Sequence, residues 1–162
     1  MDKSHPKRSI RLCMVMAAAI LASFDLTAQP APELVATFLG TGSGMPNNTV
    51  RAIARTGDGY LWLATGAGLT RTDGVNFLVF DRFNTPSLGC NGILSLYLDD
   101  NDLLWAGTDG CGLHIYNGSE LEPSAVNEYL EDGRVRAIAG DLQGRLWIGT
   151  ERGLYCHDGE RS

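Results

Sequence analysis

The feature that most constrains this 162-residue chain is a segment that recurs three times along it. Each copy contains a tryptophan, a small residue two positions later, a threonine and then a Gly-Leu pair. The three tryptophans are Trp62, Trp105 and Trp147. The third copy follows the first without a gap, while the middle copy is looser and carries Cys111 as a one-residue insertion. A period of 42 to 43 residues indicates an array of similar supersecondary units.

The first copy predicts four short strands joined by tight turns. Apolar or β-branched runs are found at 50–54, 61–65, 69–72 and 77–80. The Asp-Gly steps at 58–59 and 73–74 suit the positive φ angles of hairpin turns. No stretch beyond residue 28 shows helical periodicity over ten residues. The repeats therefore predict an all-β fold.

Both faces of the second strand in each copy are apolar. Trp62 and Ala64 share one face, and Leu61 and Leu63 share the other. The small residue after each tryptophan would leave room for a neighbouring sheet. This pattern favours sheets stacked around an axis, so we expect β-propeller blades, each a four-stranded antiparallel sheet, with about three blades forming a partial propeller. If Trp147 is buried between blades, its truncation to alanine should cost about 3–5 kcal/mol.

The recurrent positions resemble the two-component regulator propeller repeat. The resemblance is carried by Asn48-Thr49-Val50-Arg51-Ala52-Ile53, then Asp-Gly-x-Leu-Trp, then Thr, Gly-Leu and Asp-Gly. It extends over about residues 45–159. The second copy departs from the pattern because Asp102-Leu103-Leu104 replaces the Gly-x-Leu step, which weakens the hairpin prediction at that turn.

The resemblance implies an extracytoplasmic ligand-sensing module of a bacterial signal-transduction protein. Proteins with such repeats place propellers ahead of a membrane span and a cytoplasmic histidine kinase or diguanylate cyclase. The expected ligand is a small molecule or a carbohydrate, with ligand-binding residues unknown. The remaining blades and a membrane-bound signalling module are expected beyond residue 162. This chain itself is expected to be neither an enzyme nor dependent on a cofactor.

The N-terminus has the layout of a secretory signal peptide. Four basic residues up to Arg11 precede about thirteen mostly apolar residues at 12–24, followed by Leu26-Thr27-Ala28. The apolar run is short for a membrane span, which needs about 20 residues. We expect cleavage after Ala28 and a periplasmic location or one at the extracytoplasmic face of the inner membrane, with an uncleaved anchor as the alternative.

The domain organisation follows from the leader and the repeat frame. We expect a signal peptide at 1–28, a linker at 29–44, and repeats at 45–89, 90–132 and 133–162, the last incomplete. Residues 34–39 lie where a fourth strand should precede the first copy. They are predicted to be the outer strand of a last blade that closes the ring.

Charge excludes one class of partner. The chain has a formal net charge of −6, and removal of residues 1–28 would change it to about −8. No lysine follows Lys7 and the later arginines are scattered. This composition lacks the basic patch of a nucleic-acid binder.

Three cysteines lie beyond the leader: Cys90, Cys111 and Cys156. In an exported protein one pair can be oxidised. Because Cys111 is the inserted residue and belongs to the same copy as Cys90, this pair is the predicted disulfide.

No residue pattern predicts catalytic or metal chemistry. The acidic run 99–102 lacks the ligand spacing of a calcium loop and is interpreted as a polar turn. His114 and His157 are one step apart in the repeat frame, so they should face opposite sides of their sheets and share no metal. Glu131 and Asp132 are expected in a solvated loop.

Two other functional classes stay open. The first is an exported propeller that acts as a protein-interaction scaffold. The second is a propeller enzyme of the lyase, sialidase or quinoprotein type, because 139–147 loosely resembles a quinoprotein tryptophan-docking motif. The Asp box of sialidases would place its aspartate two residues before the glycine, whereas Asp141 is three before Gly144.

Overall fold

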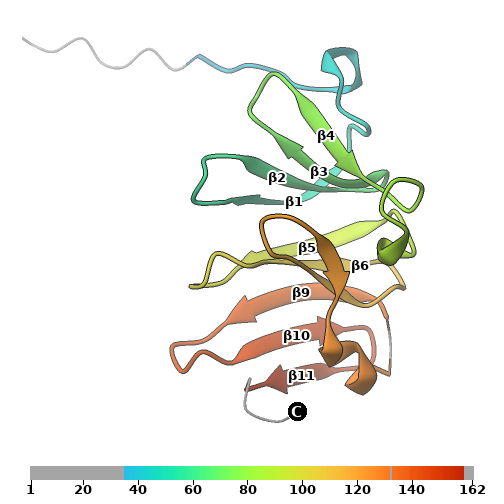
Figure 1. Ribbon diagram of the computed structural model, residues 1–162, viewed down its shortest axis with the longest axis vertical. Coiled ribbons are helices and arrows are strands. Elements are labelled where there is room, and N and C mark those ends of the chain that lie inside the picture. The colour runs from blue at the N-terminus through green and yellow to red at the C-terminus, as the bar shows by residue number, and fades with distance from the viewer. Residues whose placement is uncertain (1–34, 132, 159–162) are drawn as a thin grey trace, which may run out of the picture. The chain divides into compact units, whose positions relative to one another are not determined.

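A computed structural model describes residues 35–131 and 133–158, which form three antiparallel β-sheets (Figure 1). The strands are β1 (Val50–Arg55), β2 (Leu61–Thr65), β3 (Gly68–Thr72), β4 (Phe77–Phe80), β5 (Ile93–Leu98), β6 (Leu104–Thr108), β7 (Leu113–Tyr116), β8 (Leu121–Pro123), β9 (Val135–Gly140), β10 (Leu146–Thr150) and β11 (Leu154–His157). Three short 3-10 helices connect them: η1 (Thr41–Ser43), η2 (Pro86–Leu88) and η3 (Ala125–Tyr129). The predicted all-β fold with three blades is confirmed.

Each sheet is a meander of consecutive strands. Blade 1 has the order β1-β2-β3-β4 and blade 2 the order β5-β6-β7-β8. Blade 3 contains β9, β10 and β11 within the described residues. The four strands predicted for the first copy all form, with β1 one residue longer at its end and β3 one residue longer at its start. The local alternation of apolar side chains and the turn residues were enough to locate these four strands.

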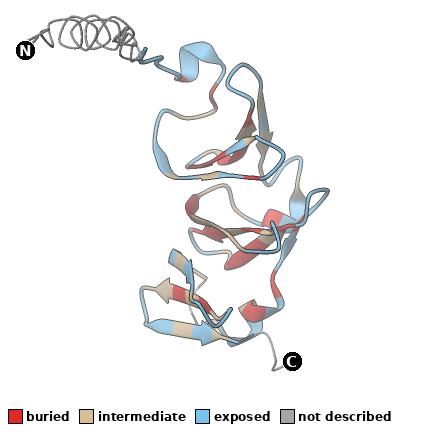
Figure 2. Cartoon of the chain, turned by 90° about the vertical axis from the view of Figure 1, so that its left-hand side faces the viewer, coloured by how far each residue is buried: buried red, intermediate tan, exposed pale blue. Residues whose placement is uncertain are grey.

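Successive blades pack face to face, and their first strands lie close together, β1 beside β5 and β5 beside β9. Each blade presents its tryptophan-bearing face to the next blade and its leucine-bearing face to the previous one. One apolar core, which includes Trp62, Ile93 and Leu104, therefore lies between blades 1 and 2. A second, which includes Val135 and Ile148, lies between blades 2 and 3. Figure 2 shows buried segments concentrated in the strands of the blades.

The three tryptophans differ in burial although they occupy one repeat position. Trp62 is fully buried, with 0% of its surface exposed. Trp105 and Trp147 are only half-buried. Burial of Trp147 between two blades stays a prediction, because no described sheet covers the face of β10 on which it lies.

The small residues that follow the tryptophans make room for the neighbouring blade, as expected. A Cβ at Gly107 would collide with Val135, the first residue of β9 in blade 3. Ser95 donates a hydrogen bond from Oγ to the carbonyl oxygen of Val135, at 3.1 Å. Close approach of the backbones therefore holds these two blades together.

The hairpin turn of blade 2 forms despite the missing glycine. Gly59 and Gly144 have φ angles of 91° and 77° in the equivalent turns. Asp102 takes their place with φ of 60°, the only positive φ among the described non-glycine residues. Aspartate tolerates this left-handed region better than most residues. Its Oδ1 also accepts the N–H of Gly57 in blade 1, at 3.1 Å, so the departure from the repeat adds a contact between blades.

The predicted domain limits are only partly within the described residues. The signal peptide at 1–28 lies outside them. Residues 35–39 form no strand in this structure. No partner strand for them is among the described residues, so the ring-closing strand stays a prediction. The three blades lie in one compact unit that begins at Phe38. No helix among the described residues is long and apolar enough to cross a membrane.

Candidate functional site

The first strand of every blade contains a β-bulge at its second residue. In blade 1, Val50 pairs with Thr65 and Ala52 with Ala64, so Arg51 has no partner residue in β2. The same break in register falls at Leu94 in blade 2. It falls at Arg136 in blade 3. A bulge redirects one side chain out of the alternation of the strand and is commonly found beside functional sites.

Arg51 uses this position to reach the next blade. Its Nη1 donates to the carbonyl oxygen of Ile93, the first residue of β5, at 3.4 Å. No carboxylate of the described residues pairs with Arg51 within 4.0 Å. Its guanidinium therefore keeps most of its donor capacity, because Arg carries five N–H groups.

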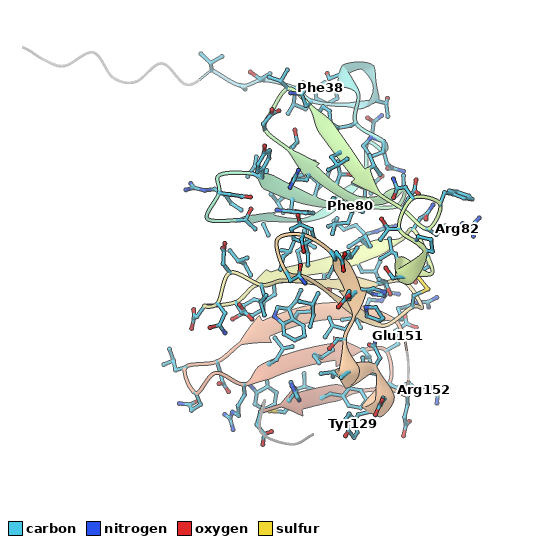
Figure 3. The ribbon with its side chains drawn as sticks, viewed as in Figure 1. Phe38, Phe80, Arg82, Tyr129, Glu151 and Arg152 are labelled. Carbon is cyan, nitrogen blue, oxygen red and sulfur yellow. A yellow bond between two sulfur atoms is a disulfide. The ribbon has the colours of Figure 1, made fainter. Side chains whose placement is uncertain are left out.

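A network of charges joins blades 2 and 3 at the same end of the first strands. Arg134 pairs through Nε with Asp109 Oδ1 at 2.5 Å and through Nη1 with Glu151 Oε2 at 3.0 Å. Arg136 also pairs with Glu151. Glu151 lies at the side of the sheets away from the turn that joins β9 to β10 (Figure 3). We call Arg51, Asp109, Arg134, Arg136 and Glu151 the first-strand cluster.

The first-strand cluster is open to solvent and carries a small positive charge. The paired side chains are 40–53% exposed, so these ion pairs contribute little to stability. Hydrogen bonds from Arg136 and then Arg134 lower the pKa of Glu151. A hydrogen bond to Asp109, followed by one to Glu151, raises the pKa of Arg134. Arg51 pairs with no carboxylate of the described residues, and its planar guanidinium suits ligands rich in oxygen.

The inserted Cys111 shapes the loop beside this cluster. Cys90, just before β5, and Cys111, between β6 and β7, are joined as a disulfide with Cα atoms 6.0 Å apart. The loop turns so that the N–H groups of Gly110 and Gly112 both donate to the carbonyl oxygen of Gly133, at 3.2 and 2.7 Å. A Cβ at Gly133 would collide with Gly110. The loop that contains the insertion therefore holds the segment before β9, where blade 3 begins, against blade 2.

Comparison with protein families decides what kind of repeat this is. Residues 44–67 and 87–110 match the family model described as two component regulator propeller. The two matched segments are two-component regulator propeller repeats. Both matched segments contain the bulged position of the first strand, Arg51 in one and Leu94 in the other.

Solved structures show a fold similar to that of this chain. The extracellular domain of a hybrid two-component system from B. thetaiotaomicron is similar at 23% identity with a TM-score of 0.63. The match covers 75% of this chain and 17% of that chain. This likeness supports the propeller fold, and this chain spans only a small part of that domain. No curated protein sequence matches the chain.

Two further structures are similar over comparable shares of the chain. One is the extracellular domain of a one-component system from B. thetaiotaomicron, at 25% identity and a TM-score of 0.37, covering 70% of this chain and 22% of that chain. The other is a streptogramin B lyase structure, at 17% identity and a TM-score of 0.46, covering 73% of this chain and 43% of that chain. Neither match is close enough to bear on activity.

The remaining residues singled out from the sequence lie apart from the first-strand cluster. The Asp99–Asp102 run forms the polar turn between β5 and β6, as expected. His114 is buried in β7 and pairs with Ala106, whereas His157 ends β11 and pairs with Leu146. Ala106 and Leu146 both lie on the face turned toward the preceding blade, so the expectation that the two histidines face opposite sides was wrong. The inserted Cys111 shifts the frame, and counted from the Gly-Leu pair the two histidines are two residues apart. Within 35–131 and 133–158, no three His, Cys, Asp or Glu side chains are placed to hold a metal ion. Glu131 is exposed, and Asp132 lies outside the described residues.

Sequence reasoning gave no functional role to any member of the first-strand cluster. Arg51 and Arg136 were interpreted only as part of the structural repeat. A signal was nevertheless present, since the residue after each repeated threonine is glycine in the first copy but acidic in the others, Asp109 and Glu151. Charged residues at a position that turn geometry leaves free are candidates for binding.

Proposed function

We propose that this chain contributes part of an extracytoplasmic ligand-sensing propeller of a bacterial two-component signalling protein. The regulator propeller repeats support the signalling class. The leader-like pattern at 1–28 supports export to the periplasm or to the extracytoplasmic face of the inner membrane. Further blades and a membrane-bound transmitter are the expected partners, and a kinase or cyclase activity would reside there.

The observation that carries the sensing role is the repeated bulge that presents arginine side chains beside the first strands. Arg51 and Arg136 occupy the same repeat position, and both are exposed. Guanidinium groups donate several hydrogen bonds in a fixed plane to hydroxyl or carboxylate oxygen atoms. A carbohydrate or another oxygen-rich small molecule therefore suits the first-strand cluster.

A matched pair of arginines in one strand tests this site. Arg51 is the second residue of β1 and lies at the bulge, whereas Arg55 ends the same strand and is also exposed. The full-length signalling protein would be screened by thermal shift against neutral and uronic-acid oligosaccharides. We expect Arg51→Ala to abolish the shift caused by a hit, and Arg55→Ala to preserve it.

The screen also separates the proposed function from its alternatives. If no compound shifts the unfolding of a natively folded protein, the sensing role is contradicted and the interaction scaffold becomes the better interpretation. Loss of binding in both arginine variants would place the ligand elsewhere. A ligand that is chemically converted during the assay would favour a propeller enzyme.

Export is tested separately by mass spectrometry of the secreted protein. Cleavage after Ala28 predicts a mature chain that begins with Gln29. Recovery of the intact N-terminus from the membrane fraction would instead indicate the uncleaved anchor.

A further inference from the structure

Large side chains close the interface between blades 1 and 2 near the turns that join the first and second strands of each blade. Leu98 and Tyr116 are the two strand partners of Leu104 in blade 2. The ring of Tyr116 lies 4.5 Å from that of Trp62 in blade 1. Leu98 packs against the same core, and Trp62 is left with no exposed surface.

The interface between blades 2 and 3 has smaller residues at the same two positions. Gly140 and His157 are the strand partners of Leu146, so they replace the leucine and the tyrosine of the first interface. Trp105, the counterpart of Trp62, remains half-buried. A cavity of about 180 Å³ opens here, between the turns that join the first and second strands of the two blades.

Tyr97 forms one wall of this cavity and is specific to blade 2. It pairs with Trp105, a position held by Ala54 in blade 1 and Ala139 in blade 3. A Cβ at residue 140 would collide with the Tyr97 hydroxyl, so Gly140 is what admits this side chain. The hydroxyl has no hydrogen-bond partner among the described residues and is available to a ligand.

The charged groups around the cavity leave a negative balance. Arg145 is neutralised by Asp141, with Nε 2.7 Å from Oδ2. Asp99 holds the indole Nε1–H of Trp105 at 2.9 Å. Asp100 is exposed and lines the cavity, and its carboxylate accepts no hydrogen bond from the residues that the structure describes. Such a site disfavours anions and attracts cations.

We infer that this cavity binds a small organic cation, an ammonium compound. Asp100 supplies the counter-charge, and the rings of Tyr97 and Trp105 supply aromatic walls that attract a cation. The volume is well below the roughly 300–1,000 Å³ of pockets for drug-sized ligands, so the ligand is small. The cavity lies at the opposite end of the first strands from the first-strand cluster, and its occupancy does not depend on the proposed sensing function.

Nuclear magnetic resonance tests the site on the full chain. The indole N–H signal of Trp105, assigned with Trp105→Phe, reports binding directly. The probes are choline and its neutral isostere 3,3-dimethylbutan-1-ol. We expect choline to shift this signal with saturation, and the neutral isostere to bind at least about tenfold more weakly because it lacks the charge.

Three variants distinguish this cavity from other acidic surfaces. Asp100→Asn should weaken choline binding by about tenfold, since it removes the counter-charge. His157→Tyr, which restores the residue type of the closed interface, should abolish binding. Glu128→Gln removes an exposed carboxylate on η3 and should leave the affinity unchanged.

Specific results would overturn the inference. These are equal affinity for choline and the neutral isostere, an absent Trp105 shift, or equal losses in Asp100→Asn and Glu128→Gln. If His157→Tyr does not fold, Tyr97→Ala takes its place. Alanine is present at the equivalent positions of the other two blades, and unchanged binding in that variant would also contradict the site.

Discussion

The carboxylate of Asp141 accepts a hydrogen bond from the indole Nε1–H of Trp147, at 2.8 Å. The same carboxylate accepts the backbone N–H groups of Gln143 and Arg145, each at 3.0 Å. The bond from Trp147 is the main reason that the pKa of Asp141 lies well below its usual range. One side chain therefore links the hairpin turn to the tryptophan of the same blade.

The other blades repeat this link six residues before their tryptophans. Asp99 accepts the indole N–H of Trp105 at 2.9 Å. In blade 1 the hydroxyl oxygen of Thr56 accepts the indole N–H of Trp62 at 3.1 Å. Ordered turns and ordered tryptophans thus depend on each other in all three copies.

Loss of Asp99 should destabilise blade 2. Its carboxylate also accepts the N–H groups of Asn101 and Leu103, at 2.9 and 3.0 Å. Because hydrogen bonds to charged groups are stronger than neutral ones, we expect Asp99→Ala to lower the free energy of unfolding by about 1.5–3 kcal/mol. Urea unfolding followed by circular dichroism measures it. Asp100→Ala is the matched control and should change stability by less than about 0.5 kcal/mol. Equal losses in the two variants would contradict a structural role for the Asp99 carboxylate.

Truncation of two repeat-equivalent tryptophans should have unequal effects. Trp62 is fully buried and contacts the rings of Phe80 and Tyr116, with centroids 5.6 and 4.5 Å away. We expect Trp62→Ala to cost about 3–5 kcal/mol. Trp147→Ala should cost about half as much or less, because no described sheet covers its face. Circular dichroism during urea unfolding compares them, and equal costs would indicate that Trp147 is covered in solution.

Stability should fall on acidification because of His114. Burial lowers the pKa of His114 below its ordinary value of 6.5. The ring Nε2 lies 3.0 Å from the carbonyl oxygen of Ser87, which can only accept, so Nε2 carries the proton. Nδ1 is buried without a partner. As the pH falls, a proton therefore binds this histidine in the unfolded chain before it binds it in the folded chain. The contribution of His114 to the free energy of unfolding is constant above about pH 6.5 and decreases as the pH falls below that value.

The measurement is the urea midpoint at several pH values. In His114→Gln the decrease just below pH 6.5 should disappear. Asp73 provides a control in a separate range, since hydrogen bonds, the largest from the backbone of Asn76, lower its pKa from 3.8 to about 2. Its contribution is present above about pH 3.8 and is lost as the pH falls toward 2. A wild-type midpoint that is flat between pH 7 and pH 5 would contradict the role of His114.

The disulfide should stabilise blade 2 and leave one free thiol beyond the leader. Cys90 and Cys111 are 21 residues apart, and Cys156 is free and exposed. We expect Cys111→Ser to lower the free energy of unfolding by about 2–4 kcal/mol. Thiol titration of the denatured chain without residues 1–28 should give one reactive thiol before reduction and three after it. Three thiols before reduction would show that the bridge does not form.

Strand positions could be predicted from the sequence because their signals are local. The Asp-Gly steps and the alternation around Trp62 act over a few residues, so the four strands of blade 1 were found almost to the residue. The bulge at Arg51 was missed because a bulge exists only relative to the partner strand. The pairing of Cys90 with Cys111 was within reach because the insertion marks the loop.

The candidate sites needed contacts between blades. Arg134 meets Asp109 and Glu151 from positions 25 and 17 residues away, and no local pattern relates them. Likewise, blade 3 has His157 at the position where blade 2 has Tyr116, and this difference has no consequence within blade 3 alone. It opens a cavity only because the next surface is Trp105 of another sheet.

The repeat by itself determined the blade, its strands and their order, because hydrophobic alternation and turn chemistry act within about ten residues. Only the tertiary structure decided which repeated side chain is buried and which arginine leaves its strand. It also decided where two blades fail to close, because these properties depend on a second sheet whose residues lie a whole repeat away.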